Sequence, residues 1–165
     1  MQVIQQAFSH SSSTFMIGKI QGNIVDLLYA PLSAAEVTIS ISLAAATRSI
    51  MIAAISIITF YFIVDVKIKH FFLLIFFTFS TSFILGNIGI ISGLWAEKFD
   101  HQATVTNFII VPLSFLSGTF YSIERLPNIL NILSSYNPFF YMIDGFRYGF
   151  LGESDGSVMF GIIYL

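Results

Sequence analysis

Two sets of charged residues could do chemistry inside an otherwise apolar chain. Asp144 and Arg147 are three residues apart, so on a helix they share a face and can form an ion pair. That pair could hold a hairpin together or contact a substrate. Arg48 stands alone in an apolar run, where a guanidinium must reach the headgroups or find a partner. The sequence leaves open whether Arg48 reaches the cytoplasmic headgroups or lies on a substrate path.

No catalytic or metal site is indicated by the remaining residues. The three histidines fall in different predicted loops, and no pair has metal-ligand spacing on one helix. The chain has no cysteine, which excludes disulfides and thiolate chemistry. A P-loop is also missing, because Gly18-Lys19 is followed by Ile20 and lacks the glycine five positions earlier. We therefore expect no catalytic residue, metal or cofactor in this chain.

The composition is that of a membrane protein. Hydrophobic residues make up 56% of the chain and charged residues 10%, whereas a soluble domain is about one quarter charged. The 19 phenylalanines suit a surface that faces lipid. A net charge of -2 gives no reason to expect a nucleic-acid partner.

Three apolar segments predict complete transmembrane helices, over about residues 37–64, 71–95 and 102–121. At 1.5 Å per residue each can cross a hydrocarbon core about 30 Å thick. Ser33 and Glu36 form a capping box before the first segment, and Pro112 should kink the third. Asp100 is the expected N-cap of that third helix. Residues 1–13 are mixed in polarity, and a disordered N-terminal tail would fit them.

Small residues recur at helical spacing in two of these segments and predict close helix packing. In the first segment the stripe is Ser42, Ala45, Ser49, Ala53 and Ser56. In the second segment the stripe is Ser82, Gly86, Gly89 and Gly93.

Two segments are too short to span a membrane. Residues 22–30 predict an interfacial helix that Pro31 ends. Residues 126–151 predict a re-entrant hairpin, with Pro127 in the first turn of one limb and a break at Asn137-Pro138. The alternative is one ordinary span over residues 132–151. Residues 157–165 predict part of a further span.

Two blocks of sequence resemble the permeases of the type-2 ABC (ATP-binding cassette) exporters. One block comprises PLSFLSGTFY at 112–121, Leu126-Pro127, Asn137-Pro138 and YMIDGFR at 141–147, and the other is GNIVDLLYAPLS at 22–33. Each motif is short, but their order, their spacing and the apolar runs between them extend the resemblance over nearly the whole chain. The fold that it implies is an all-α integral membrane protein: a helical bundle with an N-terminal interfacial coupling helix and a C-terminal re-entrant helical hairpin. Residues 1–165 would form a single, truncated domain that begins late in the second of six helices.

The resemblance also implies a function and partners. The chain would be the membrane-spanning subunit of an ATP-driven exporter in the bacterial inner membrane, forming the translocation pathway as a homodimer. A separate ABC ATPase would bind ATP and Mg, so this chain would not be an enzyme by itself. The alternative is a membrane-embedded assembly or scaffold protein without transport activity. No motif indicates the substrate.

Roles for individual residues follow from the same resemblance. Contacts with the ATPase would come from the coupling helix, at Gly22, Asp26, Leu27, Leu28 and Pro31. The re-entrant gate would comprise Ser117, Gly118, Pro127, Asn137, Pro138, Tyr141, Asp144 and Arg147. The implied topology places two lysines in the cytoplasm and four cationic residues outside, a bias opposite to the positive-inside rule. The charges therefore favour the other orientation, but we keep the orientation that the resemblance implies.

Overall fold

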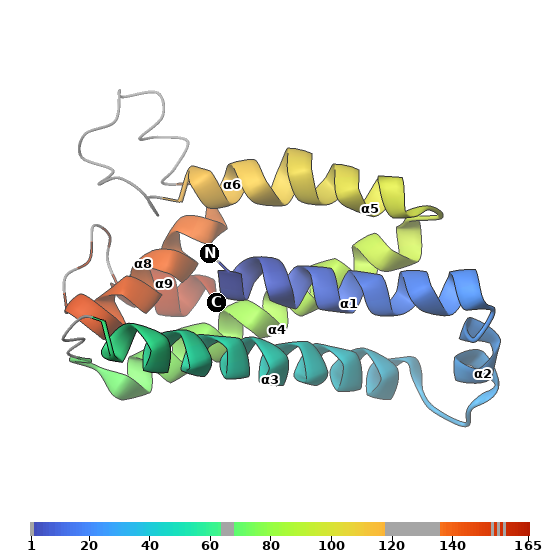
Figure 1. The fold of residues 1–165 in the computed structure, drawn as a ribbon, viewed down its shortest axis with the longest axis horizontal. Helices are drawn as coiled ribbons and strands as arrows, with labels where there is room; N and C mark the ends of the chain where they lie inside the picture. The colour runs from blue at the N-terminus through green and yellow to red at the C-terminus, as the bar shows by residue number, and fades with distance from the viewer. Residues whose placement is uncertain (1, 64–67, 118–135, 153, 155, 157) are drawn as a thin grey trace.

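A computed structural model describes residues 2–63, 68–117, 136–152, 154, 156 and 158–165 (Figure 1). All regular elements within these residues are helical. The elements are α1 (Gln2–Gln21), α2 (Ile24–Tyr29), α3 (Ala34–Tyr61), α4 (Phe71–Trp95), α5 (Phe99–Val105), the π-helix η1 (Thr106–Ile110), α6 (Val111–Phe115), α8 (Pro138–Leu151) and α9 (Val158–Tyr164).

Helices α3 and α4 are long and apolar enough to cross a membrane. Their 28 and 25 residues correspond to about 42 and 38 Å of helix. The capping box that starts α3 is present: Ser33 N donates to Glu36 Oε2 at 2.7 Å, and Glu36 N donates to Ser33 Oγ at 3.3 Å. Helix α4 covers residues 71–95, the range expected from its apolar run.

The third apolar segment consists of three short helical elements, α5, η1 and α6, rather than one regular α-helix. In η1 the turn widens, and Val111 N donates to Thr106 O five residues earlier. Pro112 follows directly, and its ring would crowd the carbonyl one turn before it in a regular α-helix. The π-turn supplies the extra room. The expectation of an Asp100 N-cap was wrong, because the N-cap position is Lys98 and Asp100 lies in the first turn.

Helix α1 corrects the alternative of a disordered N-terminal tail. It is a regular helix of 20 residues, and it lies alongside α4 and α3 (Figure 1). Its buried residues recur at three- and four-residue steps, which makes one face of a helix. These residues are Ile4, Ala7, Phe8, Ser11, Ser12, Phe15 and Met16.

Helix α4 is the centre of the packing, because it contacts α1, α3 and α8. The apolar core lies where α1, α4 and α8 meet the end of η1. Its buried members are Ile4, Ala7, Phe8, Leu85, Ile110, Phe139 and Met142. Helix α8 in turn contacts α9. The bundle therefore places α2 at one end of the long helices and α8 near the other (Figure 1).

Candidate functional site

The short helix α2 projects from the end of the bundle, in the turn between α1 and α3 (Figure 1). Gly22 makes the turn out of α1 with a φ of 77°, a conformation that other residues rarely adopt. Asp26 lies in the first turn of α2, and Asp26 O accepts from Ala30 N at 3.1 Å as the helix ends before Pro31. The chain then enters the capping box of α3. Both ends of α2 are thus fixed by local structure.

The surface of α2 is more apolar than its position at the end of the bundle requires. Val25 is 47% exposed and Tyr29 is 85% exposed, while Leu27 is half-buried and Asp26 is exposed. The sequence had pointed to Leu27 and Leu28 as the apolar anchors. Of these, the side chain of Leu28 lies outside the described part of the structure. A short helix fixed at both ends with exposed apolar side chains can seat in a groove of a partner protein.

Lys19 joins this end of the bundle to α4, a contact that the sequence analysis did not identify. Its Nζ donates to Gly93 O at 3.0 Å, to Ala96 O at 2.9 Å and also to Leu94 O. These carbonyls lie at the C-terminal end of α4, where a cation is favoured by the helix dipole and by unpaired carbonyl groups. A lysine in the last turn of a helix before a glycine was the available signal. It could not reveal that the partner is another helix.

The stripe of small residues on α4 faces α1 and α3. A Cβ at Gly89 would lie 2.4 Å from Phe8 O, and one at Gly93 would lie 2.6 Å from Ser12 O. At Gly86 the nearest atoms are Ala45 Cβ and Ser11 Oγ at 3.4 Å. Ser82 is fully buried in the same row. At Gly89 and Gly93 the backbones of α1 and α4 therefore pack closely against each other.

A second close contact joins α8 to α4. A Cβ at Gly149 would lie 3.0 Å from Leu74 Cα, and one at Gly145 would overlap the ring of Phe77. At the start of α4, His70 N donates to Gly149 O at 3.0 Å. The sequence analysis did not single out this pair, although Gly145 and Gly149 have the four-residue spacing typical of packed membrane helices.

Asn137 fixes the start of α8. Its Oδ1 accepts from Phe139 N at 3.0 Å, and its Nδ2 donates to Leu113 O at 2.8 Å. Pro138 occupies the first helical turn, where its missing N–H leaves nothing unpaired. The buried side chain of Asn137 therefore caps α8 and ties it to Leu113 of α6, which lies 24 residues earlier in the sequence.

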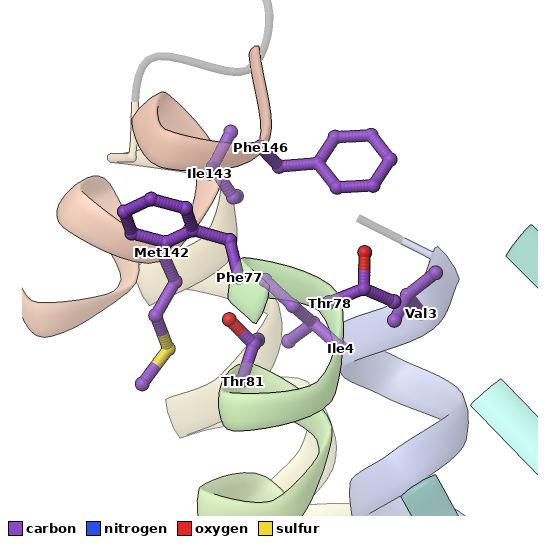
Figure 2. A pocket seen from close by; sticks show the side chains of 8 residues that line it. All are labelled: Val3, Ile4, Phe77, Thr78, Thr81, Met142, Ile143 and Phe146. Carbon is purple, nitrogen blue, oxygen red and sulfur yellow. The ribbon is translucent and has the colours of Figure 1, made fainter. Parts of the chain in front are cut away.

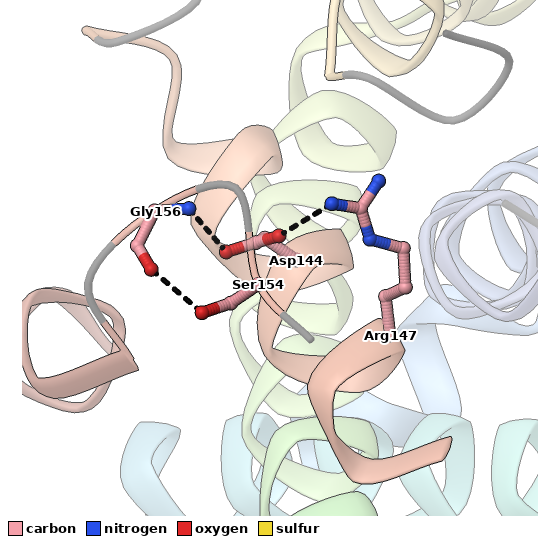
Figure 3. Close-up of polar contacts among 4 residues, drawn as sticks. All are labelled: Asp144, Arg147, Ser154 and Gly156. Atoms are coloured by element: carbon pink, nitrogen blue, oxygen red, sulfur yellow. Dashed lines mark hydrogen bonds and ion pairs between the residues drawn. The ribbon is translucent and has the colours of Figure 1, made fainter. Parts of the chain in front are cut away.

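The charged pair on α8 holds the turn that follows the helix (Figure 3). Arg147 Nη2 lies 3.3 Å from Asp144 Oδ1, and Asp144 Oδ2 accepts from Gly156 N at 3.0 Å. Ser154 Oγ donates to Gly156 O at 2.8 Å in the same turn. Asp144 is only 5% exposed. Its contacts join α8 to the segment leading into α9. That the pair holds the hairpin stays a prediction, because the other limb lies outside the described residues.

The other residues expected at the gate are only partly described. Ser117 is buried after α6, and its hydroxyl donates to Ser114 O. Tyr141 is half-buried in α8, with its ring 5.1 Å from that of Phe140. Gly118 and Pro127 lie outside the described residues, as does the expected first limb of the hairpin. Of the expected gate residues, the structure joins Asn137 to α6 through Leu113 O and pairs Asp144 with Arg147.

A small pocket of about 50 Å³ lies where α8 crosses α4 and the start of α1 (Figure 2). Phe77, Met142 and Phe146 are among the side chains that line this pocket. Thr81 is 4% exposed, and its hydroxyl has no hydrogen-bond partner among the described residues. In the same described residues, no group of three His, Cys, Asp or Glu could hold a metal ion. The polar contacts of Asn137 and Asp144 thus serve a helix cap and a turn.

Comparison with known proteins places this arrangement in a family. Residues 1–151, from α1 to the end of α8, match the family described as ABC-2 type transporter. The chain is 32% identical over 165 residues to the inner membrane transport permease YadH of Escherichia coli K12, covering 99% of this chain and 64% of that protein. The protein of the same name from Shigella flexneri gives the same identity and coverage. No solved structure gives a significant match.

The chain thus spans 64% of the length of these curated relatives. The family match nevertheless covers nearly all of the described helices. Together with the two membrane-length helices, it shows that this chain belongs to the ABC-2 type transporter family of membrane permeases.

Proposed function

We propose that this chain forms the membrane-spanning subunit of an ATP-driven exporter in the bacterial inner membrane. Two copies would line the translocation pathway, and a separate ABC ATPase would bind ATP and Mg. The family match and the printed name of the relatives, inner membrane transport permease, support this proposal. The absence of a P-loop in the sequence agrees with an ATPase on another polypeptide.

The observation that carries the proposal is the position of α2 and its link to the bundle. Its apolar side chains Val25 and Tyr29 are exposed at the end of the bundle. Shortly before α2 in the sequence, Lys19 donates hydrogen bonds to carbonyl groups at the C-terminal end of α4. A push on α2 would therefore be transmitted to α1 and α4 together, and from α4 to α8 through Gly145 and Gly149. This is the mechanical path that a coupling helix requires.

The test uses the full-length protein reconstituted with the ABC ATPase that we expect a neighbouring gene to encode. Tyr29→Glu should abolish stimulation of the ATPase, because a charge left unpaired in an apolar groove costs several kcal/mol. Tyr29→Phe keeps the ring and should retain stimulation. Leu28→Glu tests the anchor named from the sequence and should act like Tyr29→Glu.

Two results would contradict the proposal. One is a Tyr29→Glu protein that stimulates the ATPase as well as the wild type does. The other is a wild-type protein that purifies without any ATPase and leaves its activity unchanged on mixing. The second result would favour a membrane-embedded scaffold instead.

We also propose that α8 is the second limb of a re-entrant hairpin that closes the outer end of the pathway. Its 14 residues correspond to about 21 Å, which is short of a hydrocarbon core about 30 Å thick. Asn137 ties its start to α6, and Asp144, in the middle of the helix, ties it to the turn before α9. Cysteines placed at Asn128 and Gly152 should both be labelled from outside the cell. Labelling from opposite sides of the membrane would instead require an ordinary span.

A further inference from the structure

A polar contact joins α1 and α3 near the middle of both helices. Arg48 Nη1 lies 3.2 Å from His10 Nδ1. Arg48 is exposed, and His10 is half-buried. Thr14, one turn along α1, is also exposed, and its hydroxyl donates to His10 O at 2.8 Å. The two helices thus present a small polar surface on a face that is not covered by any described residue.

The contact lies deep relative to the ends of the helices. Arg48 is about 21 Å along α3 from its start at Ala34, and its side chain points back toward that start. His10 is about 16 Å from the end of α1 at Gln21. A hydrocarbon core about 30 Å thick and centred on α3 would contain the guanidinium. Held at His10, the guanidinium does not extend to the headgroups.

The charge of Arg48 is not balanced within the described structure. No carboxylate oxygen of the described residues lies within 4.0 Å of the guanidinium. His10 accepts from one of its five N–H donors. An arginine at this depth is costly unless it pairs or faces a wet cavity, and such residues mark pathways. An anion from outside the described residues would balance this charge.

The surroundings indicate what carries that anion. Met51 on α3 is 64% exposed, and Ile17 on α1 is 43% exposed. They are three residues from Arg48 and seven residues from His10, spacings that put them on the same faces of the two helices. A guanidinium suits the oxygens of a phosphate or carboxylate, which it can hold with two parallel hydrogen bonds. A ligand that fits this face has an anionic oxygen group and an alkyl chain beside it.

We propose that Arg48 and His10 form a binding site for the anionic oxygen group of an amphiphile, a phosphate or carboxylate that carries an alkyl chain. The inference rests on the proposed export function in one respect, since it names the chemical class that the pathway recognises. A phospholipid whose headgroup has entered the pathway and a free amphiphile share this chemistry.

Binding of radiolabelled dodecyl phosphate to the full-length protein in phosphatidylcholine nanodiscs tests the site, without any ATPase. We expect saturable binding that dodecyl maltoside, which is neutral, does not displace. Arg48→Gln should weaken binding roughly tenfold to a hundredfold, the range for a hydrogen bond to a charged group. Arg48→Lys keeps the charge and should lose less. Lys98→Gln removes an exposed cation outside the polar surface and is the matched control.

A second arm separates the two sources of the ligand. If phosphatidylglycerol in the nanodisc displaces dodecyl phosphate, and the displacement depends on Arg48, the site binds a bilayer lipid. If phosphatidylglycerol has no effect, the site takes a free amphiphile. Either result supports the site itself.

Three results would overturn the inference. They are equal affinity in wild type and Arg48→Gln when both elute as single species, no saturable binding at all, and displacement by dodecyl maltoside. An Arg48 that pairs with a second copy, or with another segment of the full-length protein, would give the second result. Tyr29→Glu should bind dodecyl phosphate normally, so failure of this site is distinguishable from failure of the coupling role.

Discussion

Gly89→Ala should destabilise the bundle more than Gly86→Ala, although both residues lie in one stripe of α4. The added Cβ at Gly89 would lie 2.4 Å from Phe8 O, a backbone atom of α1. Ordinary van der Waals contact begins near 3.4 Å, so α1 must move by about 1 Å. At Gly86 the nearest atoms are side chains already at 3.4 Å, and no such movement is needed.

The expected magnitudes separate the two variants. Replacing glycine by alanine inside a helix contributes about 0.5–1 kcal/mol of stability by itself. Overpacking at Gly89 costs about 1–3 kcal/mol, so the net change there should be destabilising. Gly86→Ala should be neutral or slightly stabilising. The assay is the apparent melting temperature of the full-length protein in detergent, followed by size-exclusion chromatography. Equal melting temperatures for the two variants would refute the close approach of α1 and α4.

Three further predictions concern polar contacts. Lys19→Met should lower the melting temperature slightly, since a cation at a helix C-terminus contributes about 0.3–1 kcal/mol, and should also reduce ATPase stimulation; unchanged stimulation would show that this contact transmits no force. Asp144→Asn should lower the free energy of unfolding by about 1–3 kcal/mol, because Arg147 loses its charged partner. The control Asp144→Glu should recover part of this loss in the same melting assay, and equal melting temperatures for the two variants would contradict an ion-pair role. Ser33→Ala should cost about 1 kcal/mol through loss of the capping box, whereas Ser33→Asp should restore most of the stability; failure of Ser33→Asp to do so would indicate another role for this residue.

Local signals explain why several elements could be predicted from the sequence. The capping box at Ser33 starts α3, the apolar run sets both ends of α4, and Asn137-Pro138 starts α8. Each signal acts within one helical turn or within one continuous run, so no distant residue can change it. The pairing of Asp144 with Arg147 is of the same kind, because the partners are three residues apart.

The contacts between helices could not be predicted in this way. Lys19 was readable as a lysine near a helix end, but its partner carbonyls lie more than seventy residues later, at the end of α4. His10 and Arg48 each looked isolated in the sequence and meet only because α1 and α3 pack side by side. In the expected hairpin, the limb that contains Pro127 lies outside the described residues.

The sequence by itself determined that this is a helical membrane protein, and its local signals located the starts of α3 and α8 and the extent of α4. Apolar runs, helix caps and prolines act on residues close by in the sequence, so the sequence alone contains these signals. Only the tertiary structure decided that α1, with its glutamines, serines and histidine, is a main partner of the central helix. Packing in lipid depends on how closely two backbones can approach rather than on hydropathy. The fit of Gly89 and Gly93 against the backbone of α1 is a property of two surfaces together, which neither segment reveals alone.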